Sequence, residues 1–148
     1  MAVFVINEWL WADSFGDNGA ERQKEAFNVI VKLSQSQHRI VVIVGSRFDE
    51  KAWRLCKSTN TNVAEIAKVY FGILRINSDR CLLLKSENVA ALSDNLSQSI
   101  KDDDHYLVRA QLSVNDAILV TTDEPLRNVV TQAGLSCLSR EDFLATYF

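Results

Sequence analysis

The chain has 148 residues, of which 47% are hydrophobic and 24% charged, and its formal net charge is −3. This composition is typical of a globular protein, so we expect residues 1–148 to form a single domain. The small negative charge argues against a protein that holds nucleic acid through overall charge alone. No apolar run reaches the ~20 residues that cross a bilayer. The first residues also lack the basic segment of a signal peptide, which predicts a cytoplasmic protein without a membrane partner.

The hydrophobic pattern predicts strands and helices in alternation along the chain. We expect a strand at 2–6, a loop at 16–19, a helix at 20–33, a strand at 39–44, helices at 49–57 and 63–74, and a strand at 81–84. Residues 90–100 are polar and weakly patterned, and they predict either a helix or an ordered loop. A helix at 104–114, a strand at 117–121, a helix at 125–132, a strand at 135–138 and a helix at 141–147 complete the chain.

Strands that are apolar throughout and alternate with helices indicate a parallel sheet covered on both faces. We therefore predict a three-layer α/β/α domain with a central, mostly parallel sheet of four or five strands. In such folds ligands bind beyond the carboxyl ends of the strands. That edge of the sheet is where functional residues are expected.

Acidic and amide residues gather near the ends of the predicted strands. They are Asn7 and Glu8, Asp49 and Glu50, the run Asp102 to Asp104, and Asp123 and Glu124. Each acid could simply cap a helix, an interaction worth ~0.3–1 kcal/mol. Two carboxylates ~4 Å apart, however, repel by about 4 kcal/mol at an effective dielectric of about 20, so a cluster requires protonation or a bound cation. Oxygen ligands suit Mg²⁺ or Mn²⁺, which can activate water and brace a phosphodiester for in-line attack.

The segment DDDHYLVRAQLSVNDAILVTTDEPL, followed by GLSCLSREDFL, resembles the C-terminal half of a PIN domain. The resemblance extends to VFVINEWL and HRIVVIVGSRFDEKAW, and so covers nearly the whole chain. It implies a metal-dependent ribonuclease that cleaves single-stranded RNA with acids around Mg²⁺ or Mn²⁺, such as the toxin of a toxin–antitoxin pair. RNA and an antitoxin protein are the partners it implies.

By this resemblance, Asp123 is the acid that ends a strand, and Asp103 or Asp104 is the acid that opens a helix. We favour Asp103, because it places Ala110 seven residues further on, at the small inward position of the family pattern. Glu50 matches the glutamate of a short helix, although a shift of one residue would put Lys51 there instead.

The first-strand position departs from the family pattern, because Asn7 stands where an aspartate is usual. An asparagine can bind a metal through its carbonyl oxygen but brings no charge. Alternation along a strand would point Glu8 to the other face, unless a turn begins at once. Two outcomes stay open: Glu8 turns inward and replaces the missing charge, or the site binds metal only weakly. The weak site is slightly favoured, because the other acids are retained.

Four further residues are candidates for contacts with the substrate. Arg47, Lys51 and Arg54 lie near the end of the second strand and could contact phosphates, although a solvated helix face explains them equally well. Thr121 could bind a scissile phosphate through its hydroxyl or simply end a strand.

The segments EWLW and FLATYF predict a homo-oligomer, a dimer in the simplest case, because they offer more hydrophobic surface than a small domain hides. The main alternative to a nuclease is a catalytically inactive PIN-like module that binds RNA or protein. A phosphate-accepting receiver domain is disfavoured, because the middle strands lead into Gly45–Ser46 and Lys85–Ser86 and offer no reactive aspartate.

Overall fold

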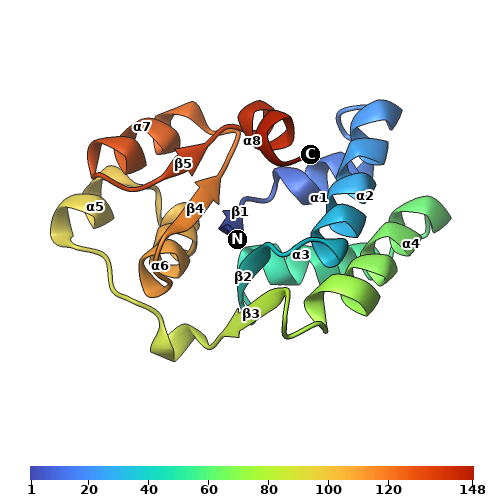
Figure 1. The fold of residues 1–148 in the computed structure, drawn as a ribbon, viewed down its shortest axis with the longest axis horizontal. Helices are drawn as coiled ribbons and strands as arrows, with labels where there is room; N and C mark the ends of the chain where they lie inside the picture. Colours follow the sequence, from blue (N-terminus) through green and yellow to red (C-terminus); the bar gives the residue numbers. More distant parts are fainter.

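Five parallel strands form the centre of the fold in the computed structural model, which describes all residues from 1 to 148 (Figure 1). The strands are β1 (Val3–Ile6), β2 (Arg39–Ile43), β3 (Cys81–Leu84), β4 (Ala117–Val120) and β5 (Cys137–Leu138). Their order across the sheet is β3-β2-β1-β4-β5, and every neighbouring pair is parallel. The predicted three-layer α/β/α fold is confirmed. The β1 strand lies in the middle of the sheet, so its carboxyl end is flanked by those of β2 and β4.

Helices cover both faces of the sheet (Figure 1). One face carries α1 (Trp9–Phe15), α2 (Ala20–Gln35), α3 (Arg47–Cys56), α4 (Thr61–Val69) with the π-helical turn η1 (Tyr70–Arg75), and α8 (Arg140–Tyr147). The other face carries α5 (Asp94–Ser99), α6 (His105–Ser113) and α7 (Glu124–Gln132). Two short 3₁₀ turns, η2 (Ser86–Asn88) and η3 (Asp102–Asp104), complete the chain.

The strand side chains alternate between two hydrophobic cores. In β1, Phe4 and Ile6 face the core beneath α1 to α4, whereas Val3 and Val5 face the core beneath α6 and α7. Because helices cover both faces, all four residues of β1 are buried, whereas Leu83 on the edge strand β3 is 44% exposed. This double burial explains why the strands are uninterrupted apolar runs in the sequence.

The structure differs from the predicted elements mainly where an element is short. No element is predicted for residues 9–15, which form α1, because seven residues are too few for a clear helical period. The helix predicted at 63–74 is split into α4 and a π-helical turn, and only Cys137–Leu138 of the predicted last strand pairs with β4. The weakly patterned stretch at 90–100 contains the short helix α5.

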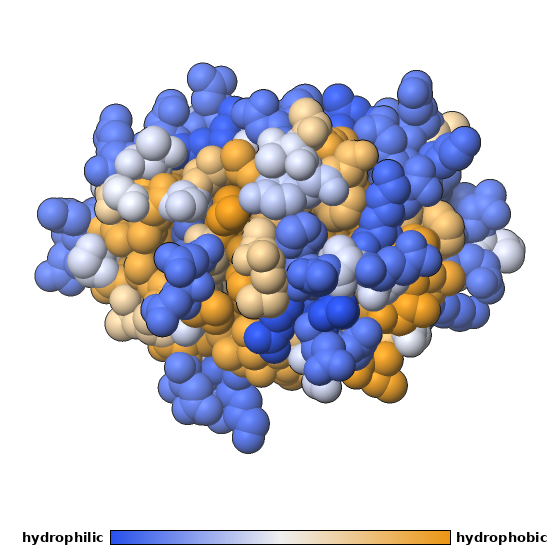
Figure 2. Space-filling model, in the orientation of Figure 1, coloured by the Kyte–Doolittle hydropathy of each residue, from blue (hydrophilic) through white to orange (hydrophobic).

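The apolar segments behind the dimer prediction pack inside the chain itself. Trp9, Leu10 and Trp11 are all buried, and Phe143 in the C-terminal segment lies fully buried against Phe4, with ring centroids 4.9 Å apart. The apolar residues of EWLW therefore supply no dimer surface, whereas Leu144, Tyr147 and Phe148 are only partly buried, and the dimer stays a prediction. Hydrophobic residues still show in patches between hydrophilic ones on the face seen in Figure 2. None of the helices combines the length and apolar character that crossing a membrane would need.

A buried ion pair ties the C-terminal helix to the start of the chain. Arg140 in α8 donates from Nε to Oδ2 of Asp13 in α1 over 2.8 Å, and its Nη2 lies 3.2 Å from a carboxylate oxygen of Glu25 in α2. Both Arg140 and Asp13 are almost completely buried. Because an unpaired buried charge is very costly, each partner depends on the other.

We predict that Arg140→Ala lowers the free energy of unfolding by about 3–5 kcal/mol, because it leaves the Asp13 carboxylate buried and unpaired. The measurement is urea unfolding at neutral pH. The matched control is Arg22→Ala, whose exposed pair with Glu141 spans 3.9 Å and is worth about 0–1 kcal/mol. Equal losses for the two variants would contradict the importance of the buried pair.

Candidate functional site

Glu8 points inward because a turn begins directly after β1. Its backbone is helical, with φ −66° and ψ −5°, and it precedes the first residue of α1. The alternation of a strand therefore stops at Asn7, and only 15% of the Glu8 side chain is exposed. Oε1 of Glu8 lies 3.0 Å from Nζ of Lys51 and 3.5 Å from Nε of Arg47. Both cations come from the first two turns of α3, which follows β2.

Asn7 holds this turn in place through both ends of its amide group. Its Oδ1 accepts a hydrogen bond of 2.6 Å from the backbone N–H of Glu8, and its Nδ2 donates over 2.7 Å to Oγ1 of Thr121. Asn7 is therefore engaged within the protein, and its role in this geometry is to position its neighbour. The backbone N–H of Asn7 also donates to the carbonyl of Val120, which extends the β1–β4 pairing.

Thr121 is fully buried just beyond the end of β4. Besides accepting from Asn7, its Oγ1 accepts from the backbone N–H of Asp123 over 3.1 Å. The carbonyl of Thr121 accepts from Arg127 in α7, an arginine that the sequence reasoning did not single out. The Thr121 hydroxyl thus links the ends of β1 and β4. Its burial leaves it no surface for the substrate contact expected from the sequence.

Asp123 combines the two roles that the sequence left open. Its Oδ1 accepts from the backbone N–H of Leu126 over 3.1 Å, so it caps the first turn of α7. Together with Asp104 and Lys101 it also lines a small cavity of about 150 Å³. Capping fixes the direction of this carboxylate and does not remove it from the site.

Asp104 is the acid of the DDD run that faces the other carboxylates. Burial raises the pKa of Asp104, and the nearby charges of Asp123 and Glu8 raise it further, while Lys101 lowers it. Asp103, favoured from the sequence, is 72% exposed and pairs with Nη1 of Arg47 over 3.2 Å. Arg47 also contacts Glu8, so Asp103 lies at the exposed rim of the same charge cluster while Asp104 is the more buried of the two.

Glu50 does not face the acids. Its side chain is 58% exposed, and its nearest cation is Arg54, one helical turn away at 4.0 Å. Lys51, one residue later, occupies the place opposite Glu8, as the alternative register anticipated. The preceding Asp49 is buried in a bidentate pair with Arg75, with contacts of 2.7 and 2.9 Å, and belongs to the core.

Tyr106 in α6 is a member of the site that the sequence reasoning missed. The residue is half-buried, and its hydroxyl oxygen is buried without a well-formed hydrogen bond. Burial raises the pKa of this phenol, and the nearby Glu8 carboxylate raises it further. An aromatic residue within a helix is normally predicted to be part of the hydrophobic core. The sequence around Tyr106 therefore gives no sign that it belongs to a functional site. His105, in contrast, is engaged with the backbone carbonyls of Ser97 and Ile100.

The structure therefore brings Glu8, Asp104 and Asp123 to one edge of the sheet and leaves Asp103 and Glu50 at the surface. The charges of Glu8 and Asp123 both raise the pKa of Asp104, after burial as the main cause. No three histidine, cysteine, aspartate or glutamate side chains converge on a single point that could hold a metal ion. Lys51 and Arg47 supply the positive charge nearest to Glu8.

No protein-family model and no curated protein sequence matches this chain. The geometry of the strand ends is therefore the basis for any functional conclusion.

Asp104→Asn should stabilise the protein at neutral pH in the presence of EDTA. The raised pKa means that the folded state binds the Asp104 proton more tightly than the unfolded chain does. The resulting penalty is absent below the ordinary pKa of 3.8 and is complete above the raised one. Thermal unfolding at pH 4 and pH 7.5 should show a larger gain in melting temperature at pH 7.5. Asp102→Asn, which alters a fully exposed side chain, is the control. The same pH-dependent gain for both variants would refute this account of Asp104.

Proposed function

We propose that the protein is a PIN-like, metal-dependent endoribonuclease that acts on single-stranded RNA. The observation that carries the proposal is the inward turn of Glu8, whose carboxylate, like that of Asp123, lies close enough to Asp104 to raise its pKa. This arrangement restores the negative charge that Asn7 lacks at the end of β1. The parallel sheet and its acidic carboxyl edge support the resemblance to PIN domains without establishing membership of that family.

The oxygen donors at this edge are of the type that a hard divalent cation takes, but the three carboxylates do not converge on one point here, so they would have to move closer together to hold the ion. Asp104 has no ion-pair partner within the protein, and Asp123 uses one carboxylate oxygen to cap α7. Oxygen donors of this kind are the ligands that Mg²⁺ and Mn²⁺ prefer. Asp104, Asp123 and Glu8 are the residues that would hold the ion. When bound, Mg²⁺ or Mn²⁺ supplies an activated water and neutralises the phosphodiester.

The remaining residues of the site bind the phosphate of the substrate or hold the carboxylates in position. Lys51 and Arg47 are each about half exposed, so their charges are accessible to a phosphate that approaches Glu8. Hydrogen bonds that Asn7 and Thr121 accept from the backbone fix the positions of Glu8 and Asp123. The raised pKa keeps the Tyr106 phenol protonated, so its buried O–H remains a donor toward Glu8.

One observation favours a second function, a catalytically inactive RNA- or protein-binding module. Nζ of Lys51 lies 3.0 Å from Oε1 of Glu8, and this ammonium group could replace a metal ion as the permanent counter-charge. In that alternative the carboxylates form a structural ion cluster with Lys51. RNA binding then does not depend on a divalent cation.

An antitoxin protein and a second copy of the chain remain proposals for partners. They follow from the resemblance to toxin–antitoxin nucleases and from the dimer prediction, respectively. Sedimentation velocity at high protein concentration tests the dimer directly. A monomer under all conditions would reject it.

The test of the nuclease is RNA cleavage, measured with a labelled single-stranded RNA in MnCl₂ and in EDTA. We expect Glu8→Gln, Asp104→Asn and Asp123→Asn each to lower the cleavage rate by roughly 100-fold or more, because each removes a charge from the proposed metal ligands. The matched control is Glu50→Gln, which changes an exposed glutamate outside the site and should leave the rate unchanged.

A loss of cleavage in Glu50→Gln would contradict the placement of the site. No cleavage by the wild type, with no rise of its melting temperature in MnCl₂, would favour the binding module. In that case RNA binding should be equal in MnCl₂ and EDTA. Lys51→Met should then lower the melting temperature, because Glu8 would lose its nearest counter-charge.

A further inference from the structure

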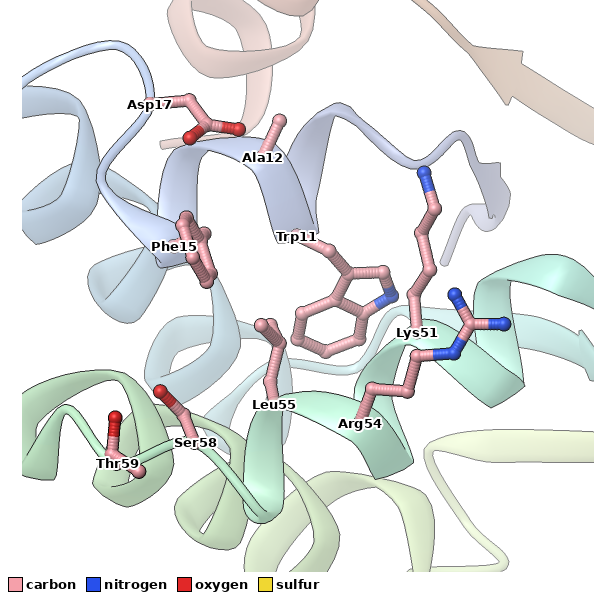
Figure 3. A pocket seen from close by; sticks show the side chains of 9 residues that line it. All are labelled: Trp11, Ala12, Phe15, Asp17, Lys51, Arg54, Leu55, Ser58 and Thr59. Carbon is pink, nitrogen blue, oxygen red and sulfur yellow. The ribbon is translucent and has the colours of Figure 1, made fainter.

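An open cavity of about 560 Å³ lies between α1 and α3, beside the acidic edge (Figure 3). Its volume is within the range of ~300–1,000 Å³ that is typical of small-molecule sites. Lys51 lines this cavity and also contacts Glu8 over 3.0 Å, so the cavity begins where the proposed catalytic site ends. No role has so far been assigned to the space.

The middle of the cavity is aromatic and apolar. Trp11, Phe15 and Leu55 contribute to its lining, and Phe15 is 52% exposed, so its ring is accessible. Trp11 is only 2% exposed, and its indole Nε1 has no hydrogen-bond partner. Figure 3 shows that nitrogen on the side of the indole toward Lys51 and Arg54. An unpartnered donor in a buried side chain is uncommon, and it points to a ligand acceptor on that side.

The two ends of the cavity carry opposite charge. Lys51 and Arg54 lie together at one end, and Asp17 lies across the cavity from them (Figure 3). Arg54 is 75% exposed, and its only ion pair is the loose contact with Glu50. A ligand with an anionic group, a flat ring and amino or ring N–H donors at its far end matches this order of groups. A nucleotide has all three.

We propose that this cavity binds one nucleotide of a single-stranded RNA, adjacent to the phosphate that faces Glu8, Asp104 and Asp123. The base stacks on the exposed ring of Phe15, because aromatic side chains stack on any unpaired base, and the buried Trp11 only lines the cavity. The neighbouring phosphate lies on Arg54 and Lys51. Asp17 accepts from the amino or ring N–H groups of the base. This inference rests on the proposed function for its substrate class, and it adds where that substrate binds.

The test measures binding separately from cleavage. Full-length protein is titrated into a fluorescein-labelled six-nucleotide single-stranded RNA in EDTA, and the dissociation constant is read from fluorescence anisotropy. We expect Phe15→Ala to weaken binding about tenfold, in keeping with the loss of one stacked base. Arg54→Ala should weaken it and also reduce its dependence on salt, because one phosphate contact is lost. Both positions are exposed, so the variants should fold, and thermal unfolding verifies this.

Trp53→Ala and Arg22→Ala are the matched controls. Trp53 is a half-exposed aromatic residue that is stacked on Phe71 outside this cavity, and Arg22 is an exposed cation on α2. Neither substitution should change the dissociation constant. Wild-type affinity in both Phe15→Ala and Arg54→Ala would overturn the proposal. Displacement of the RNA by a hexa-aspartate peptide as readily as by unlabelled RNA would overturn it too, because the base would then contribute nothing.

The same variants separate this inference from the proposed function. Cleavage in MnCl₂ with unaltered RNA affinity in Phe15→Ala and Arg54→Ala would leave the nuclease standing and reject the cavity as a nucleotide site. Weakened binding in these two variants, without cleavage by the wild type, would support the cavity and reject the nuclease.

Discussion

The hydrogen bond from Asn7 to Thr121 connects the two central strands at the point where both end. The same Thr121 oxygen accepts the backbone N–H of Asp123, and the other end of the Asn7 amide accepts the N–H of Glu8. One buried hydroxyl group and one amide therefore set the positions of two carboxylates from different strands. An aspartate at position 7 could accept from Glu8 but, when ionised, could not donate to Thr121. The amide is thus suited to a site in which the charge sits one residue further along the chain.

The charges around this hydrogen bond are arranged differently from those that the PIN resemblance implies. The negative charge missing at Asn7 returns at Glu8, and the helix after β2 presents Lys51 to the site while Glu50 faces solvent. Asp104 and Asp123 therefore have Glu8 as a neighbour, and Glu8 is already paired with Lys51 and Arg47. A divalent ion would complete the charge balance around Asp104, whose raised pKa reflects the cost of leaving it ionised. Affinity for the ion would depend on how readily Glu8 releases Lys51.

Lys51 also joins the acidic edge to the cavity between α1 and α3. Its position on α3 lets one ammonium group contact Glu8 while the side chain lines the cavity wall. The turn that directs Glu8 inward also starts α1, which supplies Trp11 and Phe15 to the cavity. The acidic edge and the cavity are therefore built from the same two connections, β1 to α1 and β2 to α3. A substitution that shifts either connection would affect both.

The sequence alone determined the fold and the edge of the sheet where the acids lie. Continuous apolar strands alternating with helices predict a covered parallel sheet, and the acids that follow those strands then share one edge. The sequence also places Asp123 at this edge, because a strand end and a helix cap coincide there. Only the tertiary structure shows that Asp104 is more buried than Asp103 among the other carboxylates, that Lys51 and not Glu50 lies opposite Glu8, and that Glu8 turns inward. The reason is geometric, since one residue rotates a side chain by about 100° on a helix and reverses its face on a strand. A register shift of one residue therefore leaves the fold unchanged but moves a carboxylate into the site or out of it. Contacts between segments that are distant in the sequence determine which residue faces the site.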